Sequence, residues 1–251
     1  MSAPTLRVEA LAKAFDGVKA VSGVSFAVAP GELVALIGPN GAGKTTCFNL
    51  VNGQLVPDDG SVTLGGERID GLPPRTIARK GVGRTFQIAA TFASMTVREN
   101  VQLALIAHAR GEASIAARAS DRFRIEADAL LDKVRMSRFA DQGCATLAYG
   151  DAKRIELALA LAGRPRLLLM DEPTAGMSGN SRNRLMQLAA DLARQERIAV
   201  LFTEHDMDVV FGHADRVIVL DRGKIIAEGT PEAIRANTRV RAVYLGEDEA
   251  A

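Results

Sequence analysis

Short apolar runs, separated by turn residues, dominate the first part of the chain and predict strands. Apolar and polar positions alternate at residues 6–10 and 24–28, and an apolar run follows at residues 33–37. Turn-forming pairs, Asp16-Gly17 and Pro30-Gly31, lie between the runs. We expect an antiparallel sheet that leads into the strand at residues 33–37.

Later apolar runs predict the centre of a parallel sheet. Residues 167–170 read Leu-Leu-Leu-Met, and a continuous run of this kind is typical of a parallel strand buried on both faces. Asp171 and Glu172 follow it, at the carboxyl end where α/β sheets place their chemistry. Further strands are expected at residues 62–64, 82–87, 198–202, 217–220 and 224–227, the last two as a hairpin.

Helical periodicity occupies most of the remaining chain. Thr96 and Glu99 have the spacing of a capping box before a helical run over residues 97–105. Other helices are expected at residues 74–80, 124–134 and 178–194, after Gly150 and after Pro231, while residues 110–121 are a loop or an exposed helix. We interpret the chain as a single domain, in which residues 89–162 form a helical lobe, residues 1–88 and 163–235 the core, and residues 236–251 a tail.

Candidate chemistry begins with residues 38–46, which read GPNGAGKTT and fit the phosphate-loop pattern G-x-x-x-x-G-K-[ST]. A predicted strand precedes the pattern and an apolar-periodic run follows it, which is the context that the pattern requires. The glycines allow backbone N–H groups to turn inward around a phosphate. Lys44 then supplies a mobile charge, Thr45 a hydroxyl for Mg²⁺, and Thr46 a contact to the α-phosphate.

Three further side chains lie near this loop in sequence or could act at the nucleotide. Phe15 lies at a turn before the phosphate loop, and it is either a stacking platform for an adenine ring or a packing contact. Gln87 has a neutral amide that can accept from a metal-bound water and donate to another group, so it is a candidate sensor of the γ-phosphate. Cys47 lies near a helix N-terminus, but we interpret it as a small core residue.

Composition excludes some classes of function. Lys and Arg (31) nearly balance Asp and Glu (30), and this net charge of +1 gives no electrostatic footprint for nucleic acid. No apolar run approaches the roughly 20 residues that cross a bilayer, and the N-terminus does not resemble a secretion signal. Two cysteines do not make a disulfide framework. We therefore expect a soluble cytoplasmic protein.

Six ordered stretches resemble the ATP-binding subunits of ABC transporters. They are GPNGAGKTT, RTFQ, LAYGD, LLLMDEP, TAGMS and TEHDMD, and they extend over almost the whole chain. The phosphate loop occurs in many nucleotide hydrolases, whereas LAYGD shortly before LLLMDEP singles out this family. RTFQ, MTVRENV, EHDMDVV and VRAVYLGE are most similar to the subgroup that serves branched-chain amino acids and related amides.

The resemblance implies an α/β fold: a P-loop ATPase core with a parallel central sheet, a flanking antiparallel sheet and a helical subdomain that carries LAYGD. It also implies a set of residues that bind ATP. Phe15 would stack on adenine, and the residues that hold the phosphates would be Asn40, Gly41, Ala42, Gly43, Lys44, Thr45 and Thr46. Ala148, Tyr149 and Gly150 would form the signature that caps the ATP of a partner chain.

The resemblance further implies the residues of hydrolysis. Glu172 would polarise the attacking water as general base, and Asp171 would hold Mg²⁺ through water. Gln87 would contact Mg²⁺ and line the groove where a membrane subunit docks. His205 would be the switch histidine that contacts the γ-phosphate. A carboxylate beside a metal-held phosphate suits phosphoryl transfer, which depends on positioning and charge stabilisation.

Two residues depart from the family pattern. The signature most often reads L-S-G-G-Q, and in this chain Ala148 takes the place of the serine. The serine would donate to the γ-phosphate of the partner chain's ATP. Losing one such hydrogen bond to a charged group costs about 1.5 to 3 kcal/mol, which is roughly a 10- to 100-fold weakening of that binding. The amides of Tyr149 and Gly150 and the helix dipole remain, so we expect a weakened signature. Ser178 stands where an aspartate is common, which affects how tightly two nucleotide sites communicate.

The expected function is that of an ATPase motor in an importer of branched-chain amino acids or related small amides. One chain would pair head to tail with a second ATPase, on the cytoplasmic side of the membrane, and drive membrane-spanning permease subunits that a solute-binding protein supplies. An ATPase of a lipid or polysaccharide exporter is the alternative within this fold. A further alternative is a soluble ABC protein acting on ribosomes or DNA. That alternative predicts a tandem cassette, a coiled-coil insertion or a basic face, and the sequence patterns indicate none of these.

Overall fold

A six-stranded sheet forms the centre of the molecule. The computed structural model describes residues 3–85, 91–109 and 123–245 of the 251. The strand order is β10-β9-β3-β8-β7-β6, and the first pair is antiparallel whereas all other neighbours are parallel. These strands are β3 (Leu33–Ile37), β6 (Val82–Thr85), β7 (Leu167–Asp171), β8 (Ala199–Thr203), β9 (Arg216–Asp221) and β10 (Lys224–Gly229). The predicted parallel central sheet is confirmed.

A second sheet is antiparallel and has the order β2-β1-β4-β5. Its strands are β1 (Leu6–Phe15), β2 (Val18–Val28), β4 (Asp59–Leu64) and β5 (Glu67–Arg68). The sequence predicted shorter strands, because register shifts interrupt the alternation of apolar and polar residues along β1. Ala10, with φ of 47°, lies at one of these irregularities, so the pattern breaks there although the pairing with β2 continues. β4 begins at Asp59, three residues before the strand expected at residues 62–64.

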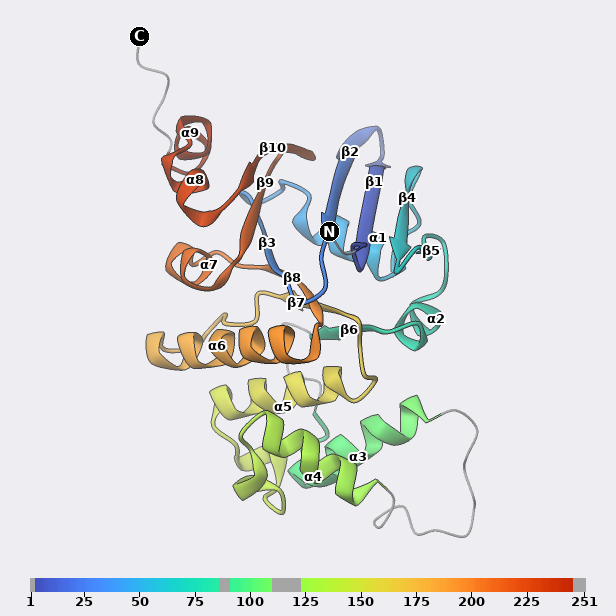
Figure 1. The fold of residues 1–251 in the computed structure, drawn as a ribbon, viewed down its shortest axis with the longest axis vertical. Coiled ribbons are helices and arrows are strands. Elements are labelled where there is room, and N and C mark those ends of the chain that lie inside the picture. Colours follow the sequence, from blue (N-terminus) through green and yellow to red (C-terminus); the bar gives the residue numbers. More distant parts are fainter. Residues whose placement is uncertain (1–2, 86–90, 110–122, 246–251) are drawn as a thin grey trace.

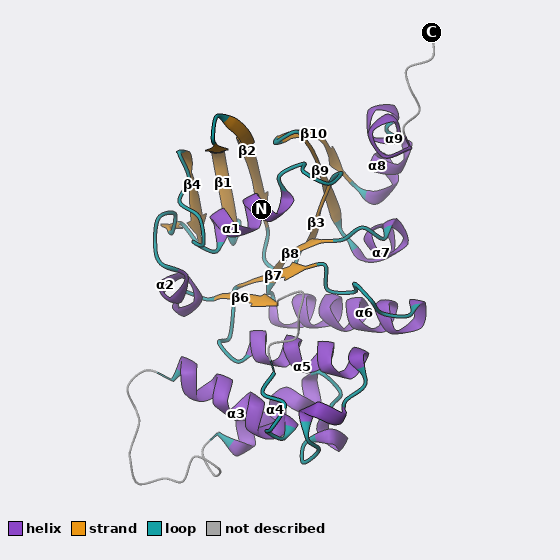
Figure 2. Ribbon diagram, turned by 180° about the vertical axis from the view of Figure 1, so that it is seen from behind, coloured by secondary structure: helices purple, strands orange, loops and turns teal. Residues whose placement is uncertain are grey.

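Helices lie on both faces of the six-stranded sheet (Figures 1 and 2). Helix α1 (Lys44–Val51) packs between the two sheets, and α6 (Gly179–Glu196) covers the opposite face of the central sheet. Below α6 in Figure 1, three helices form the helical lobe: α3 (Val97–His108), α4 (Arg124–Lys133) and α5 (Tyr149–Leu161). The remaining helices are α2 (Pro74–Arg79), α7 (Met207–His213), α8 (Pro231–Ala236) and α9 (Thr238–Leu245).

The alternation of side chains along β3 divides the apolar interior into two cores. Leu33, Ala35 and Ile37 face α5, α6 and the helical lobe, whereas Val34 and Leu36 face α1 and the antiparallel sheet. Both sets are fully buried, which explains why β3 is apolar at every position. The strand that precedes the phosphate loop is therefore held from both sides.

The starts of helices α3 and α7 compare differently with the sequence predictions. The capping box of α3 is present: Thr96 Oγ1 accepts from Glu99 N at 3.2 Å, and Glu99 Oε2 accepts from Thr96 N at 2.7 Å. Helix α7 was not predicted, and it begins where Asp206 caps the backbone N–H groups of residues 208 and 209. The segment 110–121 lies outside the described residues. No helix in the described parts of the chain has the length and apolarity to span a membrane.

The capping box gives a test of what positions the lobe. Thr96→Ala removes the side-chain acceptor at the start of α3 and should lower the free energy of unfolding by about 1 kcal/mol, measured by urea denaturation with circular dichroism. Thr96→Ser keeps the hydroxyl and should stay within about 0.5 kcal/mol of the wild type. An equal loss in both variants would contradict the role of the cap.

Candidate functional site

The phosphate loop leaves β3 and turns sharply into α1. Gly38 and Gly43 have φ of 157° and 105°, and a Cβ on Gly43 would lie 2.4 Å from the carbonyl oxygen of Ala20 on β2. Only glycine fits at residue 43, because its backbone is left-handed and β2 passes against it. Ala42 O accepts from Gly223 N at 3.0 Å, in the turn between β9 and β10. The loop is thus fixed from two sides, while Asn40 and Gly41 are exposed at its rim.

Lys44 is the first residue of α1, and its side chain lies back over the loop. Its ammonium donates to Gly38 O at 2.6 Å and to Pro39 O at 3.1 Å, and the residue is only 8% exposed. Burial lowers the pKa of Lys44, while the nearby charges of Glu172 and Asp171 act in the opposite direction. The ammonium and the two carboxylates therefore share one electrostatic environment.

The other predicted nucleotide contacts surround this loop. Thr45 and Thr46 lie in the first turn of α1, with Thr45 exposed. Phe15 is the last residue of β1 and 43% exposed, with Lys13 Nζ 5.8 Å from its ring centre. The β1–β2 hairpin that carries Phe15 lies, through Ala20, against Gly43 of the phosphate loop and Gly223 of the β9–β10 turn. Cys47 is fully buried, and burial raises the pKa of its thiol to about 12, so the interpretation as a core residue is confirmed.

The predicted carboxylates meet the end of β8. Asp171 pairs in register with Thr203, whose hydroxyl donates to Asp171 Oδ1 at 2.8 Å. The same hydroxyl accepts from Glu172 N at 3.1 Å. Glu172 has φ of 45°, so the chain turns at this residue and its side chain leaves the strand direction. One threonine hydroxyl therefore holds both predicted acidic residues.

Glu172 and His205 form a direct pair. Glu172 Oε1 lies 2.8 Å from His205 Nε2, and the histidine side chain is 51% exposed. The two residues come from the segments that follow neighbouring strands β7 and β8, which explains why residues distant in sequence meet at this point. The arrangement joins a general-base candidate to an imidazole that can hold or move a proton.

The sequence patterns did not single out a buried glutamate next to His205. Glu204 Oε1 accepts from Thr174 N at 2.8 Å and from Thr174 Oγ1 at 2.5 Å, and Glu204 Oε2 accepts from His205 N at 3.2 Å. It thereby fastens the segment after Glu172 to the segment that carries His205. The available signal was the polar pair Thr203 and Glu204, which directly follows the apolar run 198–202 and to which no role was assigned.

The predicted signature residues lie at the start of α5. Ala148 is the N-cap, with φ of −63° and ψ of 148°, and no side-chain cap is present. A Cβ on Gly150 would lie within 4 Å of Met177 and Ser181, and a Cβ on Gly176 would lie 3.5 Å from the ring of Tyr149. Tyr149 and Gly150 thus lie against the segment before α6. None of these neighbours belongs to the phosphate loop of the same chain.

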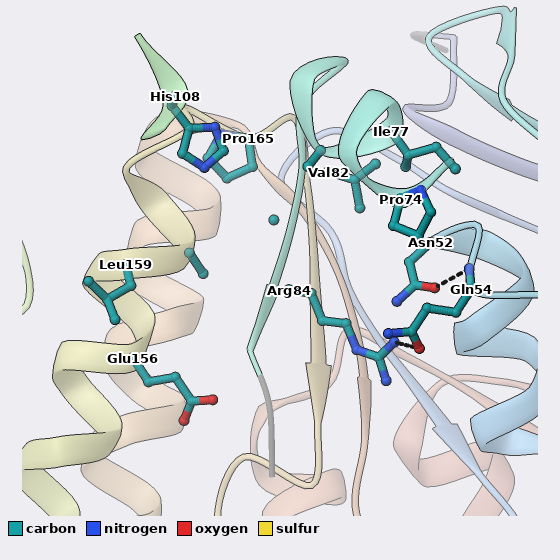
Figure 3. Close-up of a pocket in the computed structure, with 14 residues that line it drawn as sticks. Asn52, Gln54, Pro74, Ile77, Val82, Arg84, His108, Glu156, Leu159 and Pro165 are labelled. Carbon is teal, nitrogen blue, oxygen red and sulfur yellow. Dashed lines mark hydrogen bonds between the residues drawn. The ribbon is translucent and has the colours of Figure 1, made fainter. Parts of the chain in front are cut away.

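A groove of about 320 Å³ separates the core from the helical lobe (Figure 3). One wall comes from the core and includes Gln54 and Arg84, and the other comes from α3 and α5 and includes His108 and Glu156. Gln87, predicted to line such a groove, lies outside the described residues; β6, which ends at residue 85, borders the groove with Val82, Gly83 and Arg84.

Two family models match the chain. Residues 21–175 match the model described as ABC transporter, and residues 224–250 match the model of the branched-chain amino acid ATP-binding cassette transporter. The branched-chain amino acid transport ATP-binding protein BraF of Pseudomonas aeruginosa is 42% identical over 254 residues, which cover 98% of this chain and all of the relative. The lipopolysaccharide export ATP-binding protein LptB of Haemophilus influenzae is 38% identical, covering 96% of this chain and 97% of the relative.

Solved structures agree with these matches. An ATP-binding cassette of an ABC transporter in its ADP conformation superposes with a TM-score of 0.87 at 30% identity, covering 98% of this chain and 100% of that one. The dimeric structure of a second bacterial ABC transporter cassette gives a TM-score of 0.76 at 26% identity, covering 90% of this chain and 98% of that one.

The uncapped start of α5 gives a second prediction. Ala148→Ser supplies an oxygen that can accept from backbone N–H groups in the first turn, and it should raise the free energy of unfolding by about 1 kcal/mol. Ala152→Ser, one turn further along the same helix, should lower it by about 0.5 kcal/mol because serine is a poorer helix former than alanine. Urea denaturation measures both changes. A loss of stability in Ala148→Ser would show that α5 does not begin at this cap.

Proposed function

The chain belongs to the family of ABC transporter ATP-binding subunits, and on this premise we propose that it powers the import of branched-chain amino acids or related small amides. It is an ATPase by family and by fold. The observation that carries the catalytic part of the proposal is the pair of Glu172 and His205, 2.8 Å apart, in the same charge environment as the buried Lys44. The match of residues 224–250 to the branched-chain amino acid model supports the cargo class.

The chain's own residues account for the steps of hydrolysis. Lys44 and the backbone of residues 40–43 bind the phosphates, and Thr45 and Thr46 add hydroxyl groups at the start of α1. The Glu172 carboxylate takes a proton from the attacking water, while His205 Nε2 orients this carboxylate through its Oε1. Phe15, at the end of β1, offers its exposed ring to the adenine.

The residues around Asp171 fit Mg²⁺. Asp171 and Thr45 present carboxylate and hydroxyl oxygens, which are the hard ligands that this ion prefers alongside phosphates. Thr203 holds Asp171 in place at Oδ1. When bound, the ion neutralises charge that develops on the phosphates. Gln87 is the further ligand that we propose from the sequence.

We infer an assembly from the position of the signature. Because Ala148 and Tyr149 are exposed and Gly150 is partly exposed, the signature is available to a second ATPase chain, identical or paralogous. In a head-to-tail pair each signature would cap the ATP of the other chain. Permease subunits would dock in the groove between core and lobe. The pair would lie at the cytoplasmic side of the membrane, and a solute-binding protein would deliver the cargo.

An exporter is the second candidate, because a lipopolysaccharide export protein is 38% identical to the chain. The C-terminal match to the branched-chain amino acid model favours import. Co-purification of the chain with its permease subunits distinguishes the two candidates. An importer pairs with a solute-binding protein, and the ligand of that protein can be identified.

Glu172→Gln tests the catalytic proposal. The amide keeps the size of the side chain but accepts no proton, so the rate of phosphate release should fall by roughly 100-fold or more. The dissociation constant for ATP, from titration calorimetry, should stay within about threefold, because the phosphate loop is untouched.

The matched control is Glu9→Gln, an exposed glutamate on β1, which should leave the rate unchanged. If Glu172→Gln and the wild type hydrolyse ATP equally slowly, the chain is a binding module and not a motor.

A further inference from the structure

Arg84 connects the groove wall to the predicted metal ligand. It lies near the end of β6, and its Nη2 donates to Asp171 Oδ2 at 3.2 Å. Its Nη1 donates to Asn49 Oδ1 on α1 and to Gln54 Oε1, both at 3.0 Å. Figure 3 shows Arg84 extending along the core wall of the groove toward Gln54. Arg84 belongs to the stretch RTFQ, but the sequence patterns alone assign it no role.

We propose that Arg84 is a positioning residue that competes with Mg²⁺ for the charge of Asp171 and thereby sets the metal affinity of the nucleotide site. The proposal rests on the proposed function, since it requires that Asp171 face bound nucleotide. It adds a control residue to that site, at a side chain that also forms part of the groove wall.

The hydrogen bonds of Asp171 show how the competition arises. Thr203 engages Oδ1 and Arg84 engages Oδ2, so both carboxylate oxygens have partners. The threonine is neutral and leaves the negative charge of the carboxylate intact. The guanidinium carries a positive charge, which offsets the attraction of this carboxylate for a cation.

Burial makes this effect larger than for a surface pair. The Arg84 side chain is 12% exposed and that of Asp171 is 20% exposed, so water and salt screen the pair only partly. Lys44 adds a second positive charge in the same region, where Asp171 and Glu172 act on it. Removing Arg84 takes a positive charge from beside Asp171, so a dication would meet a more negative site.

A purely structural brace is the competing explanation. Arg84 joins β6, α1 and the end of β7, so it also contributes to packing. If that were its whole role, its loss would free Asp171 to rotate and would weaken the metal site. The charge account predicts the opposite sign, because repulsion between Arg84 and Mg²⁺ disappears. The sign of the change in metal affinity therefore separates the two explanations.

The experiment measures ADP binding to the full chain by titration calorimetry, in EDTA and in saturating Mg²⁺. The dissociation constant in EDTA, divided by the dissociation constant in Mg²⁺, reports what the metal adds to binding. This ratio does not depend on turnover. For Arg84→Gln this ratio should rise by about tenfold or more relative to the wild type. Arg84→Lys keeps a positive charge at the same place, and its ratio should stay within about threefold of the wild type.

Two controls separate charge from packing. Gln54→Met removes a neutral partner of the same guanidinium and should leave the ratio within about threefold. Arg216→Gln removes a half-buried arginine that pairs with Glu32 and Glu228, away from the phosphate loop. Its change in melting temperature shows the loss of stability to expect when a paired, half-buried arginine is removed. Arg84→Met, which keeps the apolar stem, provides a second neutral variant if Arg84→Gln unfolds.

The possible outcomes are distinct. A ratio that is unchanged or smaller in both Arg84→Gln and Arg84→Met overturns the inference and leaves Arg84 as a brace. A ratio that rises equally in Arg84→Lys also overturns it, because charge is then not the cause. Failure of the wild type to bind ADP under either condition overturns the proposed function, and the inference with it.

Discussion

The hydroxyl of Thr203 is the contact on which the geometry of the site depends. It donates to Asp171 Oδ1 and accepts from Glu172 N, and the register of β7 with β8 brings it there. Thr203 is fully buried, so its hydroxyl is protected from water. The turn at Glu172 then directs its carboxylate to His205. Without the hydroxyl, Asp171 Oδ1 would lose the bond from Thr203, and Glu172 N would keep its bond to the backbone carbonyl of Thr203.

The phosphate loop is fixed by a different constraint, which is close backbone packing. Gly43 lies against Ala20 of β2 and Ala42 bonds to the β9–β10 turn, so both sheets contribute to the shape of the loop. The division of β3 into two buried faces holds the strand before the loop. As a result the loop and the carboxylates are positioned by the same central sheet, one at the end of β3 and the other at the end of β7.

Much of this arrangement could be predicted from local sequence. The strands around the phosphate loop, the buried β7 and the capping box of Thr96 follow from patterns within a few residues, and the structure has all of them. Thr203, Glu204 and Arg84 were missed because their partners are distant in sequence: Glu204 meets Thr174, and Arg84 meets Asp171. No periodicity reveals such pairs, since only the strand order brings them together. The roles assigned to the site residues, including Gln87 and the signature residues, stay predictions.

The central claim is that this ATPase drives a membrane transporter. The most direct test is to purify the chain from its native membranes in mild detergent and to record its ATPase rate alone and in the complex. We expect membrane-spanning permease subunits to co-purify with the chain and to raise its rate. A chain that binds no membrane protein and turns over at an unchanged rate would not be a transport motor.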